Sequence, residues 1–478
     1  MAVTLDLDDI QGLVARGYAG LPSACYVLLS ISDAARGRAW LGSLQGAITD
    51  SSARPAGRAV QVAFTARGLG RLGLAPEIVQ RFSREFTGGM TTDHRSRLLG
   101  DVGDCAPERW RWGGPSTASV DALLLLFAPD QAALGREYAA QARSIAEHGL
   151  SEIRRLDTVD LDGVEPFGFR DSISQPIVEG LSKTGSADHT VAAGEFLLGY
   201  PNEYGLYTSR PIVAKSDDPE SLLPRDPSGS GQPDLGRNGS YLVFRQLAQD
   251  TVAFWRFVDA AAAASGAPGD PDASTRVAAK IVGRWPSGAS LVLAPDADDA
   301  SWATANDFRY VADDPHGYRC PIGAHVRRTH PRDSLDPRPG SDKSVAVGNR
   351  HRLLRRGREY GGPVPFTTEA GPVLDDDAEL PDVEVGLHFL CLNANIARQF
   401  EFVQHTWIEN PHFAGLHDEP DPLMSAQPDR AFRIPDRPVR RRFTGLPRFV
   451  TVRGGAYFFL PGLRALRWLA TQAGQSGR

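Results

Sequence analysis

The stretch VDALLLLFAPDQAALGREYAAQARSIAEHG, residues 120–149, joins a strand signal to a helix signal. Its first part is a continuous apolar run, which is typical of a central strand that is buried on both faces. From Pro129 onward the residues predict a helix that ends before Gly149, because proline favours the first helical turn and glycine the position after the last. We therefore expect a strand and a helix packed together within one domain.

The same two kinds of element recur on both sides of this stretch. Residues 24–32 and 57–65 predict two strands, and residues 33–48 between them predict a helix with an apolar stripe at helical spacing. Residues 153–161 can form a fourth strand. A β-α-β-β-α-β order of this kind is the ferredoxin-like arrangement, in which helices cover one face of an antiparallel sheet.

The remainder of the chain divides into a loop-rich segment and a second half with a similar order of elements. Residues 181–240 are rich in Gly, Ser, Pro and Asp and have few apolar anchors, which indicates a connection. We predict one domain at 1–180, this connection at 181–240, and a second domain at 241–478. The predicted elements of the second half are strands at 240–248 and 383–394, helices at 251–264, 274–285, 395–407 and 462–472, and a hairpin at 448–461 around Gly454 and Gly455.

Composition and charge exclude several classes of protein. The 478 residues suggest two to three domains, and the 41% hydrophobic and 23% charged fractions are those of a globular protein. The net charge of −6 gives no electrostatic reason to expect nucleic acid or an anionic membrane as a partner. No apolar run reaches transmembrane length, the N-terminal residues lack the features of a signal peptide, and the four cysteines form no C-x-x-C motif. We expect a reduced, cytoplasmic protein.

FGFRDSISQP, residues 167–176, places Arg170 and Asp171 side by side between a cluster of aromatic residues and a turn. An arginine next to an aspartate is commonly a solvated pair on a loop. Among aromatics and glycines, the same pair could be a carboxylate held in a partly dry pocket. The local sequence leaves both interpretations open.

CPIGAHVRRTHPRDS, residues 320–334, surrounds His325 with small residues and then with arginines. An imidazole beside small residues can approach a large flat ligand, and Arg327, Arg328 and Arg332 could bind that ligand's carboxylates by charge-assisted hydrogen bonds. An axial haem histidine with arginines for the propionates would have this composition. A surface loop of histidine and arginine is the other interpretation.

Two further polar clusters have no standard metal or nucleotide spacing. HRLLRRGREYGGP, residues 351–363, predicts either a solvated basic loop or an arginine held in a pocket. His405, His412 and His417 could bind a metal, but their spacing fits no standard zinc pattern, and exposed loop histidines are the alternative. The chain has no G-x-S-x-G motif and no Rossmann motif after a strand, so hydrolase and dinucleotide-binding functions have little support.

Taken in order, four of these motifs resemble those of the dye-decolourising haem peroxidases, in the longer-chain bacterial and fungal branch. The resemblance extends from residue 8 to residue 466. It implies an α+β fold of two ferredoxin-like domains, of the dimeric α+β barrel type, whose antiparallel sheets enclose a haem pocket. It also implies a peroxidase that contains haem b and uses hydrogen peroxide to oxidise one-electron donors such as phenols or dyes. The motifs are FGFRDSISQP, CPIGAHVRRTHPRDS, HRLLRRGREYG and GLHFLCLNANIARQFEFVQHTW.

The resemblance assigns the reacting groups. The family motif G-x-x-D-G falls on residues 168–172, so Asp171 would be the distal carboxylate that takes a proton from hydrogen peroxide and returns it to the leaving oxygen. His325 matches the proximal iron ligand. Arg355 matches the distal arginine that stabilises developing charge, and its neighbour Arg356 is the rival for that role.

Other expected roles follow from the same resemblance. Leu387 and Phe389 stand where the family has the apolar walls of the distal pocket. Arg327 and Arg332 are expected to bind the haem propionates. Glu401 is expected either to accept a hydrogen bond from the second ring nitrogen of the iron ligand, which would make that ligand more basic, or to be an exposed helix residue.

Ser172 departs from the family motif, which has glycine at this position. We expect its side chain to restrict the approach of Asp171 to peroxide or to lower the basicity of that carboxylate, so that Ser172→Gly would speed the reaction with peroxide. If Ser172 suppresses turnover, the protein would be a haem carrier or sensor. A third class is a non-haem metal or interaction protein that uses the segment from His405 to His417.

Overall fold

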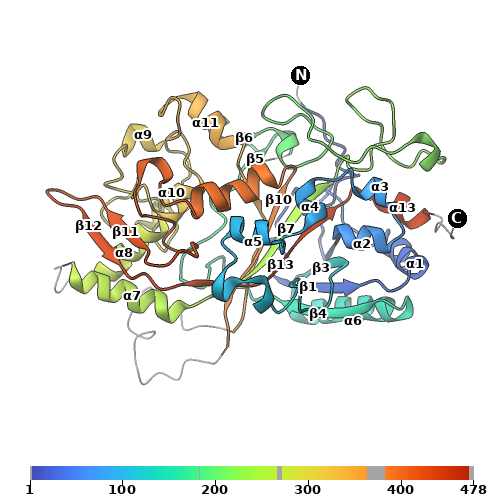
Figure 1. Ribbon diagram of the computed structural model, residues 1–478, viewed down its shortest axis with the longest axis horizontal. Coiled ribbons are helices and arrows are strands. Elements are labelled where there is room, and N and C mark those ends of the chain that lie inside the picture. Colours follow the sequence, from blue (N-terminus) through green and yellow to red (C-terminus); the bar gives the residue numbers. More distant parts are fainter. Residues whose placement is uncertain (1–2, 182, 266–271, 363–382, 473–478) are drawn as a thin grey trace.

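The computed structural model describes residues 3–181, 183–265, 272–362 and 383–472 (Figure 1). At its centre is one nine-stranded antiparallel sheet with the order β4-β1-β3-β2-β13-β7-β10-β8, in which β9 also pairs with β10. The strands of this sheet are β1 (Ser23–Ser30), β2 (Ala59–Phe64), β3 (Ala122–Ala128), β4 (Ser151–Asp157), β7 (Ser240–Gln249), β8 (Leu354–Arg355), β9 (Arg358–Tyr360), β10 (Gly386–Asn393) and β13 (Val450–Leu460).

The two halves of the chain meet edge to edge in this sheet. Strands β1 to β4 come from the first half, strands β7 to β10 and β13 from the second, and the junction is the pairing of Phe459 in β13 with Phe64 in β2. The α+β class with antiparallel ferredoxin-like strand orders is therefore confirmed. The boundaries at residues 180 and 240 stay predictions.

Side chains alternate between the two faces of the sheet, as the pleat of a strand requires. Leu124 and Leu126 of β3 belong to a core shared with Trp40 of helix α1 (Ala34–Leu44) and Ile145 of helix α6 (Gln131–Glu147). Between them, Leu125 faces a second core on the opposite side. The expected strand–helix unit at residues 120–149 is thus confirmed, with Asp130 capping the N-terminus of α6.

Part of the segment 181–240 builds the second core. Phe196, Leu197 and Tyr200 are buried there against the strands, although the composition of the segment predicts few apolar anchors. Val213, Leu223 and Leu235 of the same segment are buried in the first core, so the average composition of the segment conceals its anchors. Two short strands, β5 (Ile177–Val178) and β6 (Thr190–Val191), precede this cluster.

The predicted hairpin around Gly454 and Gly455 is wrong, because both glycines lie inside the continuous strand β13. A β-carbon at Gly454 would collide with the indole of Trp112, which donates a hydrogen bond of 2.9 Å to Gln246. The ladder between β13 and β7 shifts register at this point. Gly454 thus makes room for the Trp112 side chain at a β-bulge. Glycine inside a strand commonly has such a role.

The helix expected at 395–407 consists of two successive π-helices, Ala397–Glu401 and Val403–Ile408. Such wide turns are rare and are often found at functional sites.

No helix within the described ranges is long and apolar enough to cross a membrane. The other helices and strands are α2 (Ala66–Arg71), α3 (Pro76–Val79), α4 (Arg84–Gly88), α5 (Asp93–Leu99), α7 (Thr251–Ala264), α8 (Ala273–Val282), α9 (Tyr310–Asp313), α10 (His325–Thr329), α11 (Asp342–Asn349), β11 (Ala431–Ile434), β12 (Arg441–Thr444) and α13 (Leu463–Thr471).

We predict that Gly386→Ala destabilises the protein by about 3 kcal/mol, because the new methyl group would collide with the Leu247 carbonyl oxygen in the β10–β7 ladder. Gly135→Ala is the control, since Gly135 is exposed in α6 and an added β-carbon meets nothing within 4 Å there. That control should gain up to about 1 kcal/mol of helix stability. Urea unfolding of both variants measures these changes, and equal stability of the two would contradict the described register.

Candidate active site

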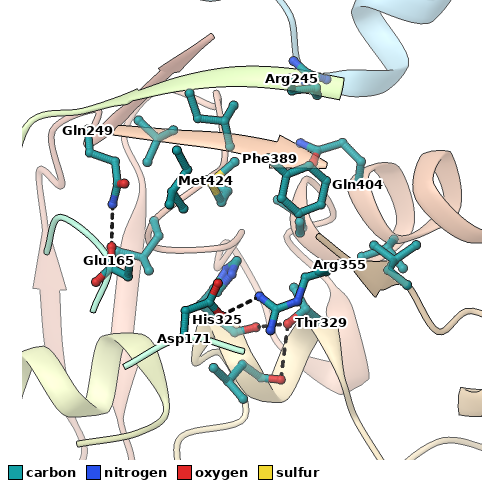
Figure 2. A pocket seen from close by; sticks show the side chains of 18 of the residues that line it. Glu165, Asp171, Arg245, Gln249, His325, Thr329, Arg355, Phe389, Gln404 and Met424 are labelled. Atoms are coloured by element: carbon teal, nitrogen blue, oxygen red, sulfur yellow. Dashed lines mark hydrogen bonds and ion pairs between the residues drawn. The ribbon is translucent and has the colours of Figure 1, made fainter. Parts of the chain in front are cut away.

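One cavity brings most of the candidate residues together. It is lined by strands β7, β10 and β13, the loop at residues 165–174, helix α10 and the π-helical segment. Figure 2 shows Asp171, His325, Arg355 and Phe389 around it. Leu387 also lines the cavity and, two positions before Phe389 on β10, faces the same side of the sheet.

Asp171 and Arg355 form an ion pair at the cavity, with 2.9 Å between Arg355 Nη1 and Asp171 Oδ1. Both side chains are 32% exposed, so the pair is neither solvated nor fully dry. Figure 2 shows this contact as a dashed line. The two interpretations of the FGFRDSISQP motif therefore resolve in favour of a carboxylate held in a pocket.

The loop that carries Asp171 is folded around a buried carboxylate. Glu165 accepts hydrogen bonds of 3.0 Å from the backbone N–H groups of Phe167 and Phe169, and Gln249 Nε2 donates to it at 2.7 Å. Burial raises the pKa of Glu165 to about 7, against the effect of these hydrogen bonds. Gly168 turns the loop with a φ of +97°, a conformation that favours glycine. Glu165 thus fixes the backbone immediately before Asp171.

The geometry distinguishes between the two tandem arginines. Arg355 lies at the end of β8, opposite Cys391 in the ladder with β10, and its side chain reaches the cavity. Arg356 points away and donates to the carbonyl oxygens of Leu13 and Val14 at 2.7 and 2.8 Å. Arg355 is accordingly the arginine beside Asp171, as its position in the motif predicts.

His325 is held from behind by an aspartate. His325 Nδ1 lies 2.9 Å from Asp421 Oδ2, and Asp421 is fully buried. Burial by itself would raise the pKa of Asp421, but the neighbouring His325, the charge of Arg328 and the backbone N–H of Met424 outweigh it and lower that pKa. With Nδ1 engaged in this way, Nε2 is the ring nitrogen that remains for a ligand in the cavity.

The expected role of Glu401 behind the histidine is wrong. Its Oε1 accepts hydrogen bonds of 2.9 Å from Arg95 Nε and from the Tyr457 hydroxyl group. Asp421 occupies the position instead. The sequence signal that could have found it is the segment DEPDP at residues 418–422, where two prolines flank an aspartate and restrict its backbone.

Arg327 and Arg332 do not line the cavity, although the sequence analysis expects them to bind a ligand there. Arg327 is buried and donates to Asp314 Oδ2 at 3.1 Å and to the Cys320 carbonyl oxygen at 2.7 Å. The Arg332 guanidinium lies 3.7 Å from the ring centre of Phe308 and donates to nearby backbone carbonyl groups. Both side chains therefore stabilise the segment around His325 from outside the cavity.

Two other arginines, Arg284 and Arg352, reach the cavity in their place. Burial, together with the positive charges of Arg332 and Arg355, lowers the pKa of Arg352 to about 9. Burial and the charge of Arg332 lower the pKa of Arg284 to about 10. A buried cation whose pKa is lowered by burial and by other cations is stabilised by an anion nearby. This side of the cavity is suited to a carboxylate-bearing ligand.

The His405–His417 segment does not form a metal site. Within residues 3–181, 183–265, 272–362 and 383–472, no group of three or more His, Cys, Asp or Glu side chains is placed to hold a metal ion. His405 is exposed on the π-helical segment, and the rings of His412 and His417 are 5.5 Å apart. These three histidines are loop and surface residues, which was the alternative interpretation.

Ser172 lies outside the cavity. It is exposed, it does not line the cavity beside Asp171, and no hydrogen bond joins it to that carboxylate. Its backbone has a φ of +64°, which lies in the left-handed region that favours glycine. The glycine of the family motif therefore meets a backbone requirement, and the expected steric hindrance of Asp171 by Ser172 has no structural basis.

We predict that Ser172→Gly raises the free energy of unfolding by about 1 kcal/mol, because it removes the strain of a side chain in the left-handed region. The rate of reaction with hydrogen peroxide should stay that of the parent. Ser116→Gly is the matched control, since Ser116 is also exposed but has a negative φ, and it should lose stability. Chemical unfolding tests the first expectation and peroxide kinetics the second; a faster variant would restore the steric interpretation.

Comparison with known proteins shows the family of the chain. No family model matches the chain. It is 30% identical to dye-decolorizing peroxidase msp1 of Mycetinis scorodonius, an alignment that covers 97% of this chain and 87% of the relative. It is also 30% identical to a dye-decolorizing peroxidase of Mycena epipterygia, with 98% and 87% covered, and 28% identical to a multifunctional dye peroxidase of Amycolatopsis, with 97% and 96% covered.

Solved structures of such peroxidases have the same fold. An ancestral D-type dye-decolorizing peroxidase superimposes with a TM-score of 0.77 at 25% identity and covers 97% of this chain and 99% of its own. A dye-decolorizing peroxidase in complex with 2,6-dimethoxyphenol gives a TM-score of 0.78 at 24% identity, with 98% and 100% covered. The relatives at 30% identity over nearly the whole chain place this protein in the dye-decolorizing peroxidase family.

Proposed function

We propose that the cavity binds haem b and that the enzyme uses hydrogen peroxide to oxidise organic one-electron donors such as phenols or dyes. The observation that carries this proposal is the presence of two polar pairs in one cavity, Asp171 with Arg355 and His325 with Asp421. The names of the relatives support dyes as donors, and the similar structure that holds 2,6-dimethoxyphenol supports phenols.

All four cysteines are free, which supports the cytoplasmic location that we also propose.

The residues of the cavity fit haem. His325 offers Nε2 to the iron, because Asp421 already occupies Nδ1. Leu387 and Phe389 supply apolar surface for a flat macrocycle, and the buried cations Arg284 and Arg352 are suited to its carboxylate groups. When bound, the haem iron supplies the redox centre that accepts oxidising equivalents from peroxide.

Asp171 would transfer a proton, and Arg355 would stabilise negative charge. Asp171 Oδ1 contacts Arg355, so Oδ2 is the oxygen that can take a proton from peroxide and return it to the leaving oxygen. The Arg355 guanidinium keeps the carboxylate oriented and presents N–H donors where negative charge develops on the peroxide oxygens. The alternative of a haem carrier or sensor depended on Ser172, whose side chain does not line the cavity.

We predict that His325→Ala binds haem at least about 10-fold more weakly and loses or shifts the Soret band, because the variant lacks the iron ligand. His405→Ala is the matched control, since this histidine is exposed and does not line the cavity. Absorption spectra during haem titration give both results. Parent-like spectra for His325→Ala would remove this residue from the iron.

We also predict that Asp171→Asn lowers the second-order rate constant for reaction with hydrogen peroxide by about 100-fold or more, because the amide cannot accept the proton. Haem content should be unchanged, since Asp171 is proposed to act on peroxide. Asp160→Asn, at an exposed position before the same loop, serves as the control. Stopped-flow mixing with peroxide measures the rate, and a rate equal to that of the parent would exclude Asp171 as the base.

A further inference from the structure

A second cluster of polar side chains lines the same cavity. It consists of Asp101, Cys105, Arg245 and Arg448, and we call it the Cys105 cluster. Arg245 projects from β7, where it pairs with Phe389 of β10 in the ladder (Figure 2). None of these four residues has a part in the function proposed above.

The sulfur of Cys105 accepts hydrogen bonds from a cation and from a backbone amide. Arg448 Nη1 lies 2.8 Å and the Val452 backbone nitrogen 3.3 Å from Cys105 Sγ. The Cys105 thiol is itself placed to donate to the Val450 carbonyl oxygen, 4.0 Å away. A guanidinium group directed at sulfur gives the electropositive surroundings that are typical of reactive cysteines.

The cluster holds more cationic than anionic side chains. Asp101 is paired with Arg245, and both are almost fully buried. Arg448 donates otherwise only to the Ala426 carbonyl oxygen, at 3.2 Å, and no carboxylate of the described ranges lies within ion-pair distance of it. Two guanidinium groups of the cluster thus accompany one carboxylate.

Arg245 gives an independent indication of a ligand. Its side chain is 5% exposed, and neither its Nε nor its Nη1 has a hydrogen-bond partner within the described part of the chain. Buried N–H groups are rarely left unsatisfied in folded proteins. A small oxygen-containing molecule in the cavity beside Cys105 could accept hydrogen bonds from both.

At the other three cysteines burial outweighs the cations nearby. Burial raises the pKa of the Cys25 thiol to about 12 and that of Cys320 to about 11, and it raises the pKa of Cys391 as well. None of the three lines the cavity. They are built-in controls for any reaction that depends on the Cys105 cluster.

We propose that Cys105 is a peroxide-reactive cysteine, a second site in the cavity at which hydrogen peroxide is reduced without haem. The thiolate sulfur attacks one peroxide oxygen, an S–O bond forms and the O–O bond breaks. Sulfur is oxidised by two electrons to a sulfenic acid, and the leaving hydroxide takes a proton from solvent to become water. The unpartnered N–H groups of Arg245 would stabilise that leaving oxygen.

The test treats the full chain, without haem and after haem loading, with hydrogen peroxide in the presence of dimedone, which captures sulfenic acids. Peptide mass spectrometry should find the adduct on Cys105 and not on Cys25, Cys320 or Cys391. Pretreatment with dithiothreitol between peroxide and dimedone should abolish it. Because the haem-free protein suffices, this outcome does not depend on the proposed peroxidase function.

Variants separate the role of the cation from effects on folding. Arg448→Gln should slow adduct formation at least about 10-fold, because the thiolate loses its charged donor, whereas Arg448→Lys should retain part of the rate. Arg453→Gln is the matched control: Arg453 lies on β13, five residues after Arg448, and it does not line the cavity. Its side chain pairs with Glu384 at 2.8 Å. Circular dichroism checks that each variant is folded.

Three results would overturn the proposal. The first is the absence of an adduct on Cys105 in folded protein, when alkylation after unfolding shows that its thiol is still intact. The second is equal labelling of all four cysteines. The third is an undiminished rate of adduct formation in folded Arg448→Gln. Cys105→Ser should lose the adduct and keep the haem spectrum of the parent, since Cys105 is no iron ligand in the proposed site.

Discussion

Strand β10 pairs with three other strands, and the position of the reacting groups depends on these ladders. Its pairing with β8 places Arg355 opposite Cys391, and its pairing with β7 places Phe389 opposite Arg245 and Leu387 opposite Leu247. A slip of one residue in either ladder would turn every one of these side chains to the other face of the sheet. The cavity therefore exists because the register of β10 is fixed by burial on both faces.

The charged groups around this strand have different surroundings. His325 is supported by a buried carboxylate whose pKa is lowered, which makes Nε2 a better electron donor to a metal. Asp171 is held by Arg355 in a partly exposed position, where a carboxylate can exchange protons with small molecules. Arg284 and Arg352 add buried positive charge, which suits an anionic ligand. The proposed iron ligand, proton acceptor and anion site thus share one cavity.

The sequence was sufficient for the parts of the site that lie within continuous motifs. Asp171, Arg355 and His325 each belong to a motif whose order along the chain is informative, and the alternation of strands and helices in residues 24–161 predicted the first half of the fold. Asp421 was missed because its partner is 96 residues away, and no local pattern records that contact. Arg284 and Arg352 line the cavity and Arg327 and Arg332 do not, because proximity to the histidine in the sequence does not determine which side chains face a cavity.

The other incorrect predictions concern positions that hold glycine, or that hold another residue where the family has glycine. Gly454 and Gly455 were interpreted as a turn, whereas Gly454 makes room for Trp112 within a strand. Ser172 was interpreted through its side chain, whereas its backbone conformation is what distinguishes the position. In both cases the residue type was informative, but the reason for it could only be found in three dimensions.

The central claim is that the cavity binds one haem, with His325 as the iron ligand and the Asp171–Arg355 pair free to act on peroxide. A crystal structure of the haem-loaded protein tests this most directly. The account predicts iron bound to His325 Nε2 and Asp171 still paired with Arg355 without binding iron. Iron bound to any other residue, or haem bound outside this cavity, would contradict it.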